Sequence, residues 1–334
     1  MTRALSLLLL FTVFTPWSFA QTKPREIHPS RSMLNLLRLS QDSSLCAVSY
    51  VHLRKLPDGR EGGDGNGALV LDVKTGVTKL DTGKNHLEPL GFTTDNKSLV
   101  MGGKWEFDLT TIQVWDLESG KPSPKVVLKK STQAGLRLLN DKIFSMSSTG
   151  NMGKYLMETW DLTGKQLESF ELDLGGRPTN VQRTPDALMV IAVDAKLQAT
   201  LVKRDAKTGK TTRVPLGGIA GTAIISDDGK WIVGNDTKAL KLLDATGKQR
   251  WAVPGKFGYP SYARVVGKQV ISSTPGGMIS IFDQATGRLV RSITTDNAEV
   301  TYWLPLPNGA LIATCQRKNR LNFGIDVFDL AKLK

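Results

Sequence analysis

The chain has 334 residues, of which 40% are hydrophobic, and a formal net charge of +13, so it is long enough for one large domain or two ordinary ones. A surplus of that size attracts polyanions in general. It is spread along the chain without a dense Lys/Arg run, which argues against a specific nucleic-acid partner. No stretch after the first twenty residues is apolar enough to span a membrane.

The first twenty residues have the pattern of a cleaved signal peptide. Arg3 supplies a positive start, residues 4–14 are an apolar run, and Ser18 and Ala20 are the small residues that a signal peptidase needs. The run is short for a bilayer span, which disfavours the alternative of an uncleaved anchor. We predict cleavage after Ala20 and a secreted or periplasmic mature chain, 21–334, with a net charge of +12 because Arg3 is lost.

Two cysteines follow the leader, Cys46 and Cys315, and neither is placed for a lipid anchor. Each lies in a short strand-like stretch near one end of the chain. The fold predicted below brings those ends together, so one disulfide is conceivable. The stretches place the two residues about three positions apart in register, which is far for a bridge that needs Cα atoms within roughly 7 Å. Two buried free thiols are the favoured prediction.

One pattern recurs along the mature chain: alternating apolar residues, then Asp, then Gly three or four residues later. It occurs as LVLDVKTG, IQVWDLESG, METWDLTG, LVKRDAKTG, LKLLDATG and ISIFDQATG, and a seventh copy, IDVFDLAK, lacks the Gly. The repeat aspartates are Asp72, Asp116, Asp161, Asp205, Asp244, Asp283 and Asp329, in steps of 44, 45, 44, 39, 39 and 46 residues. This spacing is typical of four-stranded propeller blades.

The chemistry of the pattern is that of a short hairpin. Alternation turns one side of a strand toward its neighbour, Asp accepts hydrogen bonds from backbone amides, and Gly takes the positive φ that closes the turn. Residues 87–103 and 221–235 each add an apolar run, a polar turn and a second apolar run. No long helical period interrupts the series. We predict one all-β domain, a seven-bladed β-propeller of four-stranded antiparallel blades over residues 21–334.

The repeats resemble those of WD40-type propellers of the divergent bacterial kind. Trp115-Asp116 and Trp160-Asp161 match the Trp-Asp dipeptide of that family, and SDDGKW resembles its turn before the third strand. The family's Gly-His pair is missing except for a remnant at His86, and LLDATGKQRW, ending at Trp251, is similar to quinoprotein-type repeats. The dipeptide is replaced at Leu71-Asp72, Arg204-Asp205, Leu243-Asp244, Phe282-Asp283 and Phe328-Asp329.

The last repeat ends the chain, so the seventh blade needs an outer strand from elsewhere. Residues 22–30, TKPREIHPS, are the predicted donor. Pro24 and Pro29 are tolerable there, because one side of an outer edge strand needs no ladder donors. The ring is therefore predicted to be closed by its N-terminal strand.

Catalytic motifs are sparse, and we predict that the chain is not an enzyme. The three histidines, His28, His52 and His86, lie outside metal-ligand spacing of one another and of the cysteines, and no HExxH, CxxC or GxSxG occurs. We expect no catalytic, metal or cofactor-binding residues and no cofactor. A structural hydrogen bond to a turn Asp such as Asp108 is favoured over catalysis for His86.

Residues 58–67, DGREGGDGNG, are the most unusual local feature. They fall where the second and third strands of the first blade connect. Asp64 and Asn66 resemble part of a calcium loop, but the bidentate Glu of an EF-hand is absent. A flexible insertion is the favoured interpretation.

Long loops on one predicted face combine aromatic and basic residues, which suits a binding scaffold. The candidate partner face consists of Lys104, Trp105, Phe257, Tyr259, Arg317 and Arg320. Its aromatic rings could stack on a sugar or anchor a partner, while its cations meet acidic groups. We expect a monomeric, non-enzymatic scaffold for a protein or an anionic envelope polymer. A propeller enzyme, either quinoprotein-like dehydrogenase or lactonase, and an envelope-assembly factor remain alternatives, because propellers host all three.

Overall fold

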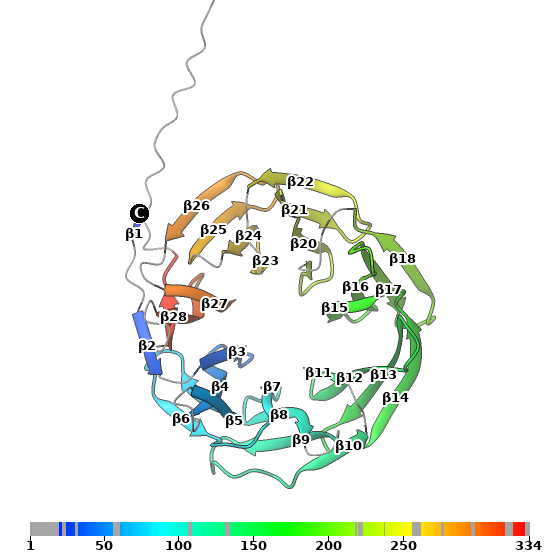
Figure 1. Ribbon diagram of the computed structural model, residues 1–334. Helices are drawn as coiled ribbons and strands as arrows, with labels where there is room; N and C mark the ends of the chain where they lie inside the picture. The colour runs from blue at the N-terminus through cyan, green and yellow to red at the C-terminus, as the bar shows by residue number, and fades with distance from the viewer. Residues whose placement is uncertain are drawn as a thin grey trace, which may run out of the picture.

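The computed structural model describes residues 20–21, 25–30, 33–55, 61–105, 109–130, 134–217, 219, 223–236, 238–255, 262–274, 277–294, 298–317 and 323–330. The strands in these ranges form seven β-sheets, arranged as blades around a central axis (Figure 1), and no helix occurs among these ranges. The predicted seven-bladed β-propeller is confirmed. Within the same ranges no helix is long and apolar enough to cross a membrane.

Blades 1 to 4 are built in chain order, each from four consecutive strands. Blade 1 contains β3 (Met33–Leu39), β4 (Leu45–Lys55), β5 (Glu61–Asp72) and β6 (Thr78–Asp81). Blade 2 contains β7 (Glu88–Phe92), β8 (Ser98–Trp105), β9 (Leu109–Asp116) and β10 (Val126–Lys130). Blade 3 contains β11 (Ala134–Leu139), β12 (Lys142–Ser148), β13 (Lys154–Asp161) and β14 (Gln166–Asp173), and blade 4 contains β15 (Arg177–Arg183), β16 (Ala187–Val193), β17 (Ala199–Asp205) and β18 (Thr211–Pro215).

Blades 5 and 6 continue the series, and blade 7 takes a strand from the other end of the chain. Blade 5 contains β19 (Ile224–Ile225), β20 (Trp231–Asn235), β21 (Ala239–Asp244) and β22 (Gln249–Pro254). Blade 6 contains β23 (Tyr262–Val266), β24 (Gln269–Ser273), β25 (Met278–Asp283), β26 (Leu289–Thr294) and a short parallel fifth strand, β1 (Ala20–Gln21). Blade 7 contains β27 (Ala298–Pro305), β28 (Leu311–Arg317), β29 (Phe323–Phe328) and β2 (Arg25–Ser30).

The ring is closed as the sequence predicts. Strand β2 pairs antiparallel with β29 from Arg25, opposite Val327, to Ser30, opposite Phe323. A register shift between Glu26 and His28 adjusts the pairing. One blade therefore joins the two ends of the chain, which removes the open edge that would otherwise end the ring.

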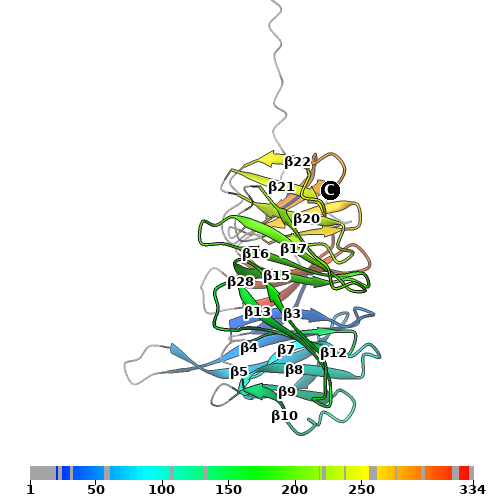
Figure 2. The same cartoon turned by 90° about the vertical axis from the view of Figure 1, so that its right-hand side faces the viewer.

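The connections divide the disc into two unlike faces. One side of the disc carries the hairpins that join second to third strands and the links that join one blade to the next. We call this side the loop face. The opposite side, which we call the turn face, carries the turns that join first to second strands and third to fourth strands. The two kinds of connection lie on opposite sides because consecutive strands of a blade are antiparallel. In the edge-on view of Figure 2, the β4–β5 hairpin projects from the loop face.

The core lies between blades. In the described part of the chain, seven clusters of buried apolar side chains occupy the seven blade–blade interfaces. The cluster between blades 7 and 1 joins Leu37 and Val48 to Ile312 and Ile325. Alternate side chains of an inner strand pack toward opposite neighbours: in β16, Met189 and Ile191 belong to the interface with blade 5, and Leu188 and Val190 to that with blade 3. The period of two that predicts strands therefore also holds neighbouring blades together.

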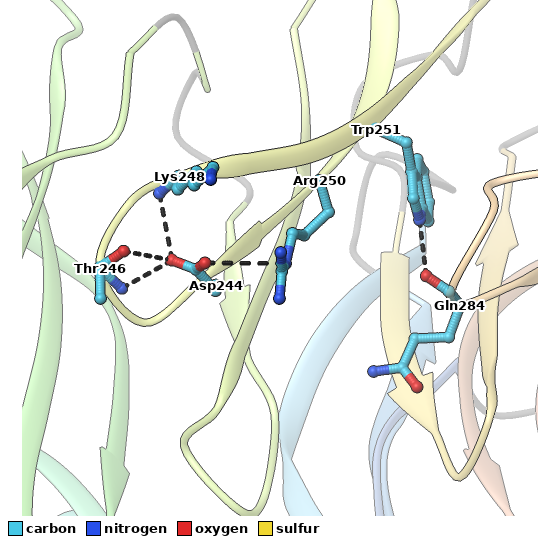
Figure 3. Close-up of polar contacts among 6 residues, drawn as sticks. All are labelled: Asp244, Thr246, Lys248, Arg250, Trp251 and Gln284. Carbon is cyan, nitrogen blue, oxygen red and sulfur yellow. Dashed lines mark hydrogen bonds and ion pairs between the residues drawn. The ribbon is translucent and has the colours of Figure 1, made fainter.

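The turn face carries the repeat aspartates. In six copies, one carboxylate oxygen accepts the backbone N–H and the hydroxyl of the following Thr or Ser, at 2.6 to 2.9 Å. Figure 3 shows the turn of Asp244, whose Oδ1 also accepts the Lys248 N–H and whose Oδ2 lies 3.7 Å from Arg250 Nε. These donors favour the charged carboxylate and lower the pKa of each aspartate.

Trp251 links two blades beside the same turns. Its indole Nε1, in blade 5, donates a 2.7 Å hydrogen bond to the carbonyl of Gln284 in blade 6 (Figure 3). Its ring lies 6.4 Å from that of Phe282, centroid to centroid. A Cβ added to Gly287, which has a φ of +70°, would lie 2.7 Å from the indole. Glycine is therefore required there by the backbone and by the neighbouring ring.

The Gly-rich insertion joins the second and third strands of blade 1 as expected but has a shorter loop, and the expectation for the cysteines is confirmed. The Gly-rich stretch at 58–67 is not a loop throughout, because β5 begins at Glu61 and pairs with the end of β4, Leu53 opposite Gly63. The insertion instead lengthens a hairpin. Cys46 and Cys315 are buried free thiols, and burial raises the pKa of the Cys46 thiol.

Candidate functional site

A cavity opens on the loop face over blades 1 to 4. Its volume is about 700 Å³. The residues around it lie at the loop-face ends of strands or in the links between blades: Asn66, His86, Glu88, Gly103, Gly135, Met146, Ser148, Tyr155, Arg177 and Pro178. We call it the mouth cavity. Its wall offers aromatic, amide, hydroxyl and charged groups from four separate blades, the mixture that binding pockets use to orient a ligand.

A second, narrower cavity of about 280 Å³ continues from the mouth cavity toward the axis. The two share Glu88, Gly135, Met146 and Pro178, so they adjoin one another. The inner cavity, which we call the throat, is also lined by Arg38 and Arg137. The strands that line it are largely first strands of blades, which face the axis of the disc (Figure 1).

Four polar side chains from different blades meet beside the throat. They are Arg38 of β3, Arg137 of β11, Arg264 of β23 and Tyr302 of β27, all on the first strands of their blades. Arg264 Nη2 donates a 3.3 Å hydrogen bond to the Tyr302 hydroxyl, and the charges of Arg38 and Arg137 lie near enough to that hydroxyl to lower its pKa. We call this group the arginine cluster. It brings together residues from blades 1, 3, 6 and 7, which only a closed ring makes neighbours.

The local backbone fixes Arg38 but not Arg137. Arg38 Nε donates to the carbonyl of Leu90 in blade 2 at 3.1 Å, and Nη1 donates to the carbonyl of Leu37 at 3.0 Å. The Arg137 side chain donates no hydrogen bond to any residue in the described ranges. It lines the throat, where solvent still reaches it but the surrounding protein partly desolvates its guanidinium. The cluster therefore holds one anchored cation and one available cation.

Positive charge predominates in the arginine cluster, and it shifts the pKa values of Arg137 and Tyr302. Burial lowers the pKa of the Arg137 guanidinium, and the charges of Arg38 and Arg264 lower it further, while Tyr302 acts the other way. For Tyr302, burial raises the pKa of the hydroxyl, but Arg264, Arg38 and Arg137 outweigh that effect and the net pKa is below its ordinary value. Both shifts have the sign expected where cations lie close together without enough negative charge to balance them.

The arrangement suits anion binding. Guanidinium groups present planar forks of N–H donors that match carboxylate and phosphate oxygens. In the described ranges, no group of three or more His, Cys, Asp or Glu residues could hold a metal ion. His86 lines the mouth cavity and has a φ of +63°, and the Asp108 predicted as its partner lies outside the described residues.

The residues predicted as the partner face are only partly placed. Phe257, Tyr259 and Arg320 lie outside the described residues. Lys104 and Trp105 end β8, and Arg317 ends β28, so their backbones reach the loop face as expected. Nothing in the described geometry brings these six side chains together, and they stay a prediction.

The sequence contained a signal for the arginine cluster that motif searches overlook. Arg38, Arg137 and Arg264 each lie two residues before the last paired residue of a first strand, namely Ser40, Leu139 and Val266. They are equivalent positions in three repeats. Aligning the repeats by their first turn, rather than by the aspartate, would have found them. Tyr302 lies two residues further back in blade 7, since Leu306 is the last paired residue there.

Comparison with known proteins does not assign the chain to a class narrower than the β-propeller fold. The chain matches no protein-family model and no curated protein. Its geometry defines it as a seven-bladed β-propeller with a cavity on the loop face and an adjoining cavity lined by Arg38 and Arg137.

Proposed function

We propose that the chain is a non-enzymatic binding scaffold, secreted or periplasmic, whose loop face binds an acidic protein or an anionic envelope polymer. The Trp-Asp turns and the spacing of the repeats support a WD40-like assignment within the propeller class. The predicted signal peptide supports a location outside the cytoplasm.

The observation that carries the proposal is the pair of adjoining cavities, the mouth cavity and the throat. Its outer part is large enough to receive an extended segment or a sugar unit. Its inner part ends at the arginine cluster. A partner with negative charge would gain complementary electrostatics as it enters, which favours both encounter and orientation. The turn face also has a cavity, of about 800 Å³ over blades 3 and 4, but the Arg183 beside it is paired with Glu168 at 3.3 Å, so this cavity presents fewer unpaired cations to an anionic partner.

Arg177 provides the sharpest test, because it is exposed and lines the mouth cavity. The mature protein, 21–334, would be immobilised, incubated with envelope extract from the source cells, and washed at about 0.3 M salt to remove binders held by charge alone. The variant Arg177→Glu reverses one charge at the mouth. Arg288→Glu makes the same change at an exposed arginine on the turn face and serves as the matched control.

We expect a discrete component to survive the wash with the unmodified protein and the control variant, and to be lost with Arg177→Glu. Both variants should melt at the same temperature as the unmodified protein, since exposed substitutions rarely change stability. Equal retention by Arg177→Glu, or no retained component at all, would refute binding at this face.

A further inference from the structure

We propose that the throat is a binding site for a compact oxyanion with more than one negative charge, held by Arg38 and Arg137 with the charge of Arg264 beside them. The inference rests on the proposed function and deepens it, because it names the chemical group that a loop-face partner presents. That group is a phosphate or a cluster of carboxylates, either free or carried on a larger molecule.

The geometry of the cluster is that of a prepared site. The Tyr302 hydroxyl oxygen accepts a hydrogen bond from Arg264, and Arg38 lies near enough to the same hydroxyl to lower its pKa. Two backbone carbonyls, those of Leu90 and Leu37, fix the orientation of Arg38. A ligand would therefore meet donors that are already ordered, so less side-chain entropy is lost on binding.

Arg137 is the residue whose surroundings indicate a bound ligand. Several other arginines of the described chain have structural partners: Arg213 donates to the carbonyls of Leu174 and Asp173, and Arg291 to that of Leu330. Arg137 has no such hydrogen bond among the described residues, and it lies among other cations. A guanidinium kept beside two like charges costs stability, and an anion between them would remove that cost.

The charge balance sets the class of ligand. Three guanidinium groups contribute three positive charges, and Glu88, which lines both cavities, contributes one carboxylate. Arg177 adds a positive charge at the mouth. No described carboxylate forms an ion pair with Arg38, Arg137 or Arg264. A group with two or three negative charges would neutralise the cluster, whereas chloride would do so only in part.

The size of the hollow indicates where such a group would lie. The throat, at about 280 Å³, admits a phosphate or a tricarboxylate but no folded segment. The mouth cavity outside it has room for whatever carries the anion. An acidic group at the end or on a branch of a partner would reach the arginines while the rest of the partner contacts the loop face.

The experiment uses the purified mature protein and needs no partner. Thermal unfolding and isothermal titration would be measured with inorganic phosphate, citrate and chloride at one ionic strength near 0.15 M, so that general screening is constant. The test variant is Arg137→Gln, which removes the charge of a side chain without described hydrogen bonds. Arg288→Gln, on the turn face, is the matched control, and Arg137→Lys keeps the charge but loses the planar fork.

We expect phosphate or citrate, but not chloride, to raise the melting temperature of the unmodified protein and of Arg288→Gln by mass action. Arg137→Gln should bind the same anion about tenfold or more weakly, and its melting temperature without anion should equal or exceed that of the unmodified protein. Arg137→Lys should bind with intermediate affinity. The anion that gives the larger rise identifies the group as phosphate or carboxylate.

Equal rises in the unmodified protein and Arg137→Gln, or no rise beyond that with chloride, would overturn the inference. The source of the anion is found by adding the effective anion to the immobilised protein with its retained partner from the pull-down experiment. If the anion elutes the partner, the partner carries the group that binds in the throat. If the partner stays bound, the throat binds a free anion. A failed anion titration with an intact, Arg177-dependent partner would refute the throat site and leave the proposed function standing.

Discussion

The turn face and the loop face of this disc are built by opposite means. On the turn face, six aspartates make the same two hydrogen bonds to a following Thr or Ser, blade after blade. On the loop face and along the first strands, blades differ. Arginine occupies one first-strand position in blades 1, 3 and 6, whereas Gly91 and Ile224 occupy the equivalent positions in blades 2 and 5. Repetition specifies the scaffold, and departures from repetition provide the candidate site.

Removing the closing strand should have the largest effect on stability. Deletion of residues 21–31 takes away β2 and leaves β29 as an open edge in blade 7. We expect the melting temperature to fall by more than about 10 °C, more than for any single substitution below. Differential scanning calorimetry would measure it. A synthetic peptide of residues 21–31, added in trans, should restore part of the loss by strand addition, and an unchanged melting curve would contradict the closure.

Trp251→Ala should have the next largest effect, because it removes a side chain that is only 8% exposed and packs across two blades. The expected loss is about 3–5 kcal/mol of unfolding free energy. Trp251→Phe keeps a ring in place but loses the hydrogen bond to the Gln284 carbonyl, so it should cost about 1 kcal/mol. Chemical denaturation would separate the two. Similar losses for both variants would show that the hydrogen bond, not the packing, dominates.

The same substitution, glycine to alanine, at Gly287 and at Gly103 compares the cost of an added methyl group on the two faces. Gly287, in a turn-face hairpin, has positive φ and lies against the Trp251 ring, so alanine there should cost about 2 kcal/mol or more. Gly103, on the loop-face side of β8, has its nearest neighbours 3.8 Å from an added Cβ, and alanine should be tolerated. Urea midpoints provide the measurement. Equal midpoints would remove the contrast between the faces.

Asp116→Asn should have the smallest effect, visible mainly as a change in pH dependence. Hydrogen bonds from the Ser119 hydroxyl and its backbone N–H hold the pKa of Asp116 below the ordinary value. A lowered folded-state pKa contributes stability that is present above about pH 4, the ordinary range, and is lost as pH falls through the folded pKa. The variant should be slightly less stable at pH 7 and lose less on acidification. Melting curves from pH 7 down to about pH 2 test this, and parallel pH profiles would contradict it.

Most of the fold could be predicted from sequence because its determinants are local and repeated. The Asp-Thr-Gly turns recur at a propeller spacing, and β2 was expected from the missing strand of the last blade. The Gly-rich stretch misled, because glycine is typical of loops, yet pairing with β4 extends β5 back to Glu61. Cross-strand hydrogen bonds outweigh the weak local preference there.

The candidate site could not be predicted in the same way. Arg38 and Tyr302 are 264 positions apart in the sequence, and only the closed ring brings them near enough to affect each other's electrostatics. No motif marks such a group, since each arginine by itself looks like an ordinary strand residue. The aromatic and basic residues of the predicted partner face come from long loops. Two of them, Phe257 and Tyr259, lie outside the described residues. They stay a prediction for partner binding.

The closing pair of strands also sets an order of events during folding. Ser30 pairs with Phe323, 293 residues later, so β2 has no partner until almost the whole chain has been synthesised. Blades 1 to 6 can form from neighbouring hairpins with short loop closures, but blade 7 must wait for contacts of the longest range, which are entropically costly and slow. Before that step the arginines of blades 1, 3, 6 and 7 are not yet gathered. A nascent or truncated chain would therefore lack the anion site even where its individual blades are formed.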